Sequence, residues 1–252
     1  MEKENKSKFY EISIYEEIAI IRIKEKVFEL ITDVNLSNEL IDFIDKIDRS
    51  PEIKALLFFN EPDCFSNEQY KKFIERIMEN AKLKDDSGPP CFAEKNVRFR
   101  EINILNTLIK QVANIQVIVI AGIQGEVVTP YTGLSMVADF RYVSENAVFS
   151  MAHNKYGLHP SGGLPFFLSN LIHHSKALEI QMNDFIAPNE ALELGLINKI
   201  LPQVEFEKHL LNEARKFTKL KYCTIRDTKR LTNFNRKSLF DYFEYEASLL
   251  NL

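Results

Sequence analysis

The sequence has few of the residues that mark several common classes of protein. It contains no tryptophan, eight glycines and three cysteines, Cys64, Cys91 and Cys223, among 252 residues. The cysteines are odd in number and widely spaced, which argues against a disulfide framework or a clustered metal site and suits a reducing compartment. No apolar run approaches the ~20 residues of a membrane span, and the charged segment 1–8 does not resemble a signal peptide. We therefore expect a cytoplasmic protein without membrane contact.

The chain also lacks a long stretch of charge of one sign. Its net charge is −4, charged residues make up 27% of it, and lysine and arginine are scattered rather than clustered. No basic stripe is present, so nucleic acid is not an expected partner. Hydrophobic residues make up 45%, as in ordinary globular proteins, and this length can bury a core as one domain, with or without a subdomain.

Apolar spacing predicts alternating strands and helices over the first half of the chain. Residues 10–23 alternate in two bursts and predict a hairpin, while Ala55–Phe59 and Ile115–Ala121 are continuous apolar runs typical of buried strands. Helical spacing follows Leu36 as far as Pro51, with Asn35 or Ser37 able to cap, and recurs after Ser66 and over 102–112. This order favours an α/β fold with parallel pairing.

The second half of the chain becomes progressively helical. Short strands are expected at 140–143 and 148–151, with helices starting near Ser161 and Ser175. Pro188–Gly195 predicts a short helix, because proline suits its first turn and glycine its end. Apolar residues then recur at helical spacing and predict that 203–252 is entirely helical. We therefore expect a core over 1–202 and a C-terminal helical region over 203–252.

Two segments carry a family resemblance. Ala138–Phe149 reads ADFRYVSENAVF, and Ser175–Glu179 reads SKALE and is followed by IAPNEALELGLINKILP over Ile186–Pro202. Both resemble the crotonase (enoyl-CoA hydratase/isomerase) superfamily, most strongly over 115–202 and collinearly over 9–70. The resemblance implies the ClpP/crotonase-like α/β fold, a spiral of ββα units with C-terminal helices that build homotrimers, often paired into hexamers.

The resemblance also implies a type of chemistry. Family members stabilise the enolate of an acyl thioester, carried by CoA or by an acyl carrier protein, without a further cofactor or a metal. Lys155-Tyr156-Gly157, together with the run that begins at Gly133, is most similar to the crotonases of polyketide β-branching. Those enzymes are decarboxylases or dehydratases that act on acyl groups held by an acyl carrier protein.

Two backbone N–H groups hold the thioester oxygen in this family, and this sequence departs from the pattern at both. Gln69 falls on the first donor position, but Ser66 stands three residues before it, so a capping box would occupy that N–H. The family's three glycines align with Thr129, Pro130 and Tyr131. Pro130 has no N–H to donate. Thr129 as N-cap with Pro130 at the first helical position would make a helix start, where the N–H of Tyr131 or the next residue could substitute.

The acid and base positions depart as well. The two carboxylates of the hydratases align with Gly133 and His153, so carboxylate-based addition of water is not expected. An aspartate used by dienoyl isomerases aligns with Ser161, a weak base. His153 is the best remaining acid/base, because imidazole gives and takes protons near neutral pH, although a packing histidine would look the same. His159 lies in a turn-rich loop and either contacts substrate or is a loop residue.

Two functions therefore remain open. The first is an enzyme that acts on an acyl thioester by decarboxylation, dehydration or double-bond shifting, with His153 as acid/base and Phe92 and Phe99 near the acyl group. The second is a catalytically degenerate protein of the same fold that binds or supports a partner, which the loss of the glycines favours. A repurposed site on the same fold is a third alternative.

Overall fold

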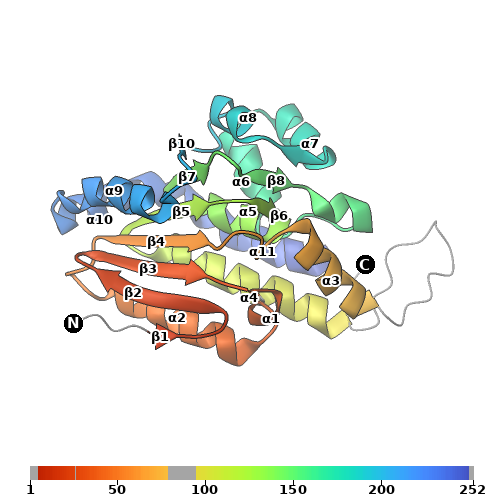
Figure 1. Ribbon diagram of the computed structural model, residues 1–252, viewed down its shortest axis with the longest axis horizontal. Coiled ribbons are helices and arrows are strands. Elements are labelled where there is room, and N and C mark those ends of the chain that lie inside the picture. Colours follow the sequence, from red (N-terminus) through yellow and green to blue (C-terminus); the bar gives the residue numbers. More distant parts are fainter. Residues whose placement is uncertain (1–4, 26, 79–94, 250–252) are drawn as a thin grey trace.

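A seven-stranded sheet crosses the computed structural model, in the order β1-β2-β3-β4-β5-β7-β10 (Figure 1). The strands are β1 (Asn5–Lys6), β2 (Tyr10–Tyr15), β3 (Ile18–Ile23), β4 (Ala55–Asn60), β5 (Ile118–Ile123), β7 (Phe140–Ser144) and β10 (Lys199–Leu201). The neighbours from β3 to β10 are parallel, and β1, β2 and β3 are antiparallel. The expected α/β fold, its opening hairpin and its parallel pairing are confirmed.

The structure describes residues 5–25, 27–78 and 95–249, and helices surround the sheet in this part of the chain. They are α1 (Val27–Leu30), α2 (Val34–Asp48), α3 (Asn67–Met78), α4 (Lys95–Asn114), α5 (Thr129–Met136), α6 (Leu164–Leu171), α7 (His174–Met182), α8 (Pro188–Glu193), α9 (Phe206–Thr218), α10 (Tyr222–Thr232) and α11 (Ser238–Ser248). Two 3-10 helices, η1 (Ala152–Tyr156) and η2 (Asn233–Lys237), complete them. No described helix is long and apolar enough to cross a membrane.

A second, three-stranded sheet lies beside the first and positions the candidate site. It contains β6 (Glu126–Val128), β8 (Val148–Ser150) and β9 (Phe185–Ile186), in the order β6-β8-β9. β6 and β8 are parallel, with Val128 opposite Ser150. Because α5 follows β6 directly and η1 follows β8, the beginnings of these two helices are held next to each other.

Both faces of the main sheet are buried. All six residues of β4 are buried, and the first five alternate between two hydrophobic clusters, one of which includes α9 and the other α2 and α4. A Cβ added to Gly122 of β5 would lie 2.4 Å from Leu210 Cδ1 of α9 and 2.8 Å from the Phe59 Cβ of β4, which cannot rotate away. Glycine is therefore required here for close packing of the helix against the sheet.

The ADFR segment joins the sheet to distant parts of the chain. The Asp139 carboxylate accepts from the Val119 N–H at 2.8 Å and from the Lys229 ammonium of α10 at 2.7 Å. The Arg141 guanidinium donates to the carbonyls of Leu196 and Ala138. The polar residues of the motif thus fasten α10 and the segment after α8 to β5 and β7. The division of the chain at 202/203 stays a prediction.

One sequence prediction fails at the start of α2. The cap of α2 is Asp33, whose Oδ1 accepts from the Asn35 and Leu36 N–H groups, so neither Asn35 nor Ser37 caps this helix. Asp33 is the better cap because it directly precedes the first turn, where its carboxylate can accept from the free N–H groups, whereas Asn35 and Ser37 lie within that turn. The loop predicted over 83–96, with Phe92, and the side chain of Phe99 lie outside the described residues.

Candidate active site

Thr129 and His153 meet at the start of α5. The Thr129 Oγ1 and His153 Nδ1 atoms lie 2.7 Å apart although the residues are separated by 24 positions in the chain. Both residues are buried: Thr129 is 0% exposed and His153 is 2% exposed. The register of β6 against β8 brings them together, because Val128 lies opposite Ser150. Thr129 directly follows Val128, and His153 comes three residues after Ser150. A buried hydroxyl paired with an imidazole can hold the ring in one orientation and one tautomer.

The start of α5 differs from the sequence prediction. The N-cap is Val128, in extended conformation and without a side-chain cap, so Thr129 is already the first helical residue and Pro130 the second. The predicted Thr129 cap is wrong, because the threonine hydroxyl bonds to His153 instead of the helix N–H groups. Val128 cannot satisfy those groups. The Thr129 and Tyr131 N–H groups therefore lie at the positive end of the helix and receive no hydrogen bond from the side chain of the N-cap residue Val128.

The Tyr131 side chain belongs to the core. Its ring is completely buried and stacks on Phe65 with centroids 4.4 Å apart, and its hydroxyl donates to the Gly122 carbonyl at 2.9 Å. Burial raises the pKa of the Tyr131 phenol well above its ordinary value, and the nearby Cys64 raises it further. The phenol consequently stays neutral and serves as an anchor. Only the Tyr131 backbone N–H is a candidate for contact with substrate.

Gly133 is closed to any side chain. A Cβ built there would lie 2.4 Å from the Gly162 carbonyl oxygen and 2.9 Å from the Ser161 carbonyl oxygen. Contacts of this kind are with backbone atoms, which cannot rotate away as a side chain can. The turn at Gly162 is fixed by a φ of +73°, a conformation that suits glycine. The position that aligns with a hydratase carboxylate is therefore physically filled by the loop that precedes α6.

The expected cap at Gln69 is half formed. The Gln69 N–H points to the Ser66 Oγ at 3.5 Å, which is longer than an ordinary hydrogen bond of this type. The Ser66 N–H instead donates to the Asp63 carbonyl, so the reciprocal half of the box is absent among the described contacts. Gln69 itself is exposed. Its N–H is only weakly held and stays a predicted donor to a thioester oxygen.

A polar network at the start of α3 was not foreseen from the sequence. The Glu126 carboxylate of β6 accepts from the backbone N–H of Asn67 at 2.9 Å and also from its side-chain amide. The Asn67 Oδ1 in turn accepts from the Ser150 hydroxyl at 3.0 Å. An anionic side chain thus already lies at the positive end of α3. The only sequence signal was a charged residue on a short strand, directly after Gly125.

His159 lies in the loop between η1 and α6. Its Nδ1 is 3.0 Å from the Pro160 carbonyl, which favours the tautomer with a proton on that nitrogen. The loop packs on α5 at Gly162, where an added Cβ would lie 3.2 Å from the Pro130 carbonyl oxygen. Contact of His159 with a substrate stays a prediction. Within the described ranges, no three His, Cys, Asp or Glu residues gather as metal ligands would.

Comparison with known proteins gives one family and one fold. The family model described as "Enoyl-CoA hydratase/isomerase" matches residues 13–251. No curated protein sequence matches the chain. Among solved structures, the enoyl-CoA hydratase from Bacillus halodurans is 19% identical with a TM-score of 0.77, covering 96% of this chain and 93% of that one.

Two further structures show the same similarity. DspI from Pseudomonas aeruginosa is 18% identical with a TM-score of 0.75, covering 98% of this chain and 91% of its own. An enoyl-CoA hydratase from Polaromonas is 20% identical with a TM-score of 0.73, and the match covers 96% of this chain and 91% of the Polaromonas chain. At these low identities the matches establish a common fold, with its two sheets and C-terminal helices. A common fold does not by itself establish a common reaction.

Proposed function

The chain belongs to the enoyl-CoA hydratase/isomerase family, and from that premise we propose that it is an enzyme that acts on an acyl thioester without hydrating it. The carrier is CoA or an acyl carrier protein. The reaction forms an enolate and leads to decarboxylation, dehydration or a double-bond shift. The observation that carries this proposal is the buried Thr129–His153 pair beside a Gly133 that has no room for a carboxylate.

His153 supplies the proton transfers in this proposal. When a C–H bond next to the thioester breaks, the imidazole takes the proton and the bonding electrons move onto the thioester oxygen. Return of the proton at another atom completes an isomerisation. Its burial keeps the ring out of bulk water, where its interaction with a developing charge would be weaker. Hydration needs a second group that positions water, and Gly133 cannot provide it.

The thioester oxygen is held by backbone N–H groups at helix starts. The uncapped first turn of α5 offers those of Thr129 and Tyr131, in place of the donor that Pro130 removes. Gln69 at the start of α3 is the second donor. Donors of this kind contribute ~2.7–4 kcal/mol each to transition-state stabilisation. His159 completes the set as a contact to the acyl group or its carrier.

The remaining parts of the proposal rest on the family. We infer a homotrimer or hexamer built through the C-terminal helices, as the resemblance implies. The likeness of Lys155-Tyr156-Gly157 to the polyketide β-branching enzymes favours a carrier-protein substrate and a biosynthetic pathway.

A second candidate is a catalytically degenerate member of the family that binds a partner. It is favoured by the contact between the Glu126 carboxylate and the Asn67 N–H, which places an anion at the start of α3. A negatively charged oxygen of substrate would be repelled there by a carboxylate. The two candidates differ in whether the oxygen-binding groups at α5 are competent.

Replacing Pro130 with glycine separates the candidates. Pro130→Gly restores an N–H at the position the family uses, while the Thr129 and Tyr131 N–H groups remain. We expect a change of less than about tenfold in kcat for acyl-CoA turnover, because the substitute donors already serve. Turnover of a panel of acyl-CoA and acyl carrier protein thioesters, followed by mass spectrometry, measures this.

The opposite result is equally informative. A gain on the order of 100-fold in Pro130→Gly would mean that the native chain lacks a competent donor, and the second candidate would then stand. Leu171→Ala, at an exposed position on α6, is the matched control and should leave turnover unchanged.

A further inference from the structure

The small sheet turns one carboxylate toward the start of α3. Side chains alternate between the two faces of a strand, and residues paired across parallel strands share a face. Val127 and Phe149 face the core and are 0% and 1% exposed. The register of β6 against β8 therefore places Glu126, Val128 and Ser150 together on the opposite face. Glu126 is half-buried there and lies next to the candidate site.

The Glu126 carboxylate is held in one position. It accepts from the Asn67 backbone N–H at 2.9 Å and also from the Asn67 side-chain amide. The Asn67 Oδ1 accepts from the Ser150 hydroxyl at 3.0 Å, which directs the amide nitrogen of Asn67 toward Glu126. Ser150 is itself buried. Two donors, one of them oriented by a buried hydroxyl, thus keep this charge from swinging away.

Glu126 lies close to both groups of backbone donors that the proposed function assigns to the thioester oxygen. Its partner Asn67 is the first residue of α3, and Gln69 follows two residues later. On the other side, Glu126 precedes Thr129, the first residue of α5, by three residues. Three residues of chain span at most about 11 Å. A charged group on the acyl chain would therefore bind within reach of the Glu126 field.

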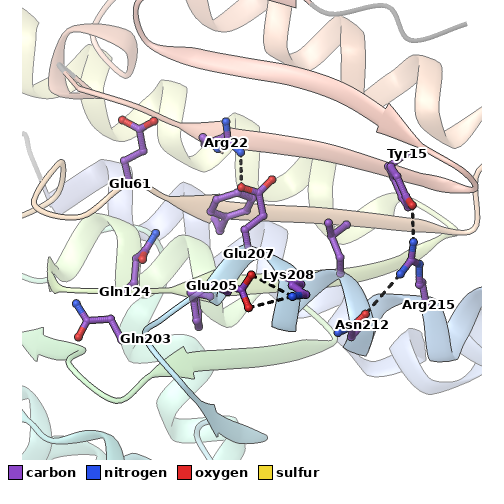
Figure 2. Close-up of a pocket in the computed structure, with 13 residues that line it drawn as sticks. Tyr15, Arg22, Glu61, Gln124, Gln203, Glu205, Glu207, Lys208, Asn212 and Arg215 are labelled. Atoms are coloured by element: carbon purple, nitrogen blue, oxygen red, sulfur yellow. Dashed lines mark hydrogen bonds and ion pairs between the residues drawn. The ribbon is translucent and has the colours of Figure 1, made fainter.

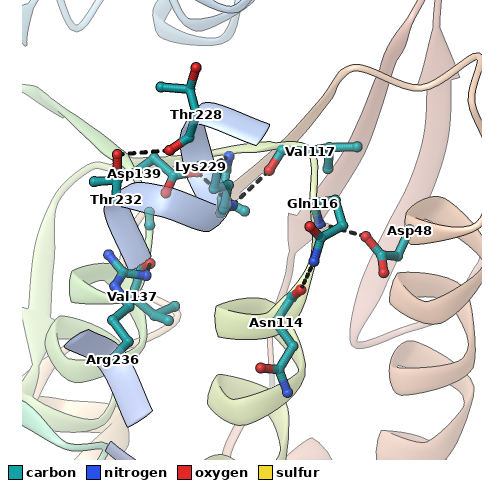
Figure 3. Close-up of polar contacts among 12 residues, drawn as sticks. Asp48, Asn114, Gln116, Val117, Val137, Asp139, Thr228, Lys229, Thr232 and Arg236 are labelled. Carbon is teal, nitrogen blue, oxygen red and sulfur yellow. Dashed lines mark hydrogen bonds and ion pairs between the residues drawn. The ribbon is translucent and has the colours of Figure 1, made fainter. Parts of the chain in front are cut away.

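No lysine or arginine forms an ion pair with Glu126 in the part of the chain that the structure describes. Carboxylates in two other places have such a partner. In the pocket that α9 forms with β2 and β3, Glu207 pairs with Arg22 (Figure 2). Below α10, Asp139 lies 2.7 Å from the Lys229 ammonium group (Figure 3). The N–H donors of Asn67 stabilise the Glu126 carboxylate, but they do not cancel its charge.

A fixed negative charge acts differently on neutral and on anionic substrates. When His153 takes a proton next to the thioester, the imidazolium becomes positive and the enolate negative, so the bound pair gains no net charge. A neutral acyl group can therefore bind and react without net repulsion from Glu126. An acyl group with a carboxylate brings a net negative charge and is repelled at this range. Proteins exclude wrong ligands by like charges placed in this way.

We propose that Glu126 is a specificity-determining residue that excludes acyl groups carrying a carboxylate. The substrate is then a thioester whose acyl group is uncharged. Glu126 has this role only if the thioester binds at the starts of α3 and α5, so the inference rests on the proposed function. Dehydration and double-bond shifting are compatible with Glu126, whereas decarboxylation needs an acyl carboxylate and is not.

Acetoacetyl-CoA and malonyl-CoA test the role of Glu126, because a methyl group in one stands where the other has a charged oxygen. Both carry the same CoA, so its phosphates do not affect the comparison. Isothermal titration calorimetry of the purified full chain at low ionic strength should show about tenfold tighter binding of acetoacetyl-CoA. Glu126→Gln keeps the side-chain shape and should bind the two thioesters within about threefold of each other. The same two acyl groups on an acyl carrier protein provide a parallel pair.

Salt gives a second measurement that needs no variant. In about 1 M salt the screening length falls to about 3 Å, so the preference of the native chain should shrink as it does in Glu126→Gln. A purely structural role of Glu126 would not produce this dependence. Glu193→Gln removes the same charge from an exposed position on α8 and should leave the preference unchanged.

The outcomes separate this inference from the proposed function. Malonyl-CoA that binds as tightly as acetoacetyl-CoA, or a preference that persists in Glu126→Gln, overturns the role of Glu126 and leaves the thioester site standing. The same holds for a preference that salt does not change. If neither thioester binds on either carrier, the thioester site itself is refuted, and the role of Glu126 with it.

Discussion

Replacing Gly133 with glutamate should destabilise the protein severely and should not create a hydratase. The new Cβ would lie 2.4 Å from the Gly162 carbonyl oxygen, and the carboxylate would be buried against two backbone carbonyls. Overpacking of this kind combined with a buried unpaired charge is expected to lower the free energy of unfolding by more than about 4 kcal/mol. Urea unfolding followed by circular dichroism measures the loss.

Two variants make this result specific. Gly133→Ala carries the same Cβ without the charge and should lose less, about 1–3 kcal/mol. Ser169→Glu places the same carboxylate at an exposed position of α6 and should be nearly neutral. If Gly133→Glu folded with native stability and hydrated crotonyl-CoA, the contact with Gly162 would be shown not to close the position.

Replacing His153 with glutamine should remove most of the acyl-thioester activity while leaving the fold intact. Glutamine can keep a hydrogen bond to Thr129 but cannot exchange a proton near neutral pH. We expect kcat to fall by a factor of about 10²–10⁴, which is the usual contribution of a positioned acid/base, with a smaller change in KM. Steady-state kinetics on the best substrate of the thioester panel measures both constants.

The neighbouring hydroxyl provides a graded comparison. Thr129→Val keeps the side-chain shape and loses the 2.7 Å contact with His153, so it should lower kcat by about tenfold through loss of ring orientation. His174→Ala, at an exposed histidine of α7, should have no effect. An unchanged kcat in a folded His153→Gln would remove the imidazole from the mechanism.

The sequence predicted the architecture because its signals there are local and repetitive. The continuous apolar runs of β4 and β5 and the helical spacing after 203 each identify an element without reference to the rest of the chain. Two of the shorter strands carried no such signal. β6 and β10 have three residues each, and their strand conformation depends on neighbours that are distant in the sequence.

The candidate site was harder to predict because its decisive contacts are long-range. Thr129 has the chemistry of a helix cap, and only the presence of His153 explains why it does not act as one. Gly133 looks like a lost carboxylate until the loop at Gly162 is placed against it. The link between Glu126 and Asn67 joins residues 59 positions apart. Only the effect of Pro130 could be predicted from the sequence itself, since the absence of a backbone N–H is a property of proline wherever it lies.

Exchange of the hydrogen next to the thioester tests the central claim most directly. The native protein is incubated with saturated acyl-CoA and acyl carrier protein thioesters in D₂O, and deuterium at that carbon is followed by mass spectrometry, beside an assay for hydration of crotonyl-CoA. Our account predicts exchange that depends on His153, without hydration. Bound thioester that shows no exchange, or efficient hydration of crotonyl-CoA, would contradict it.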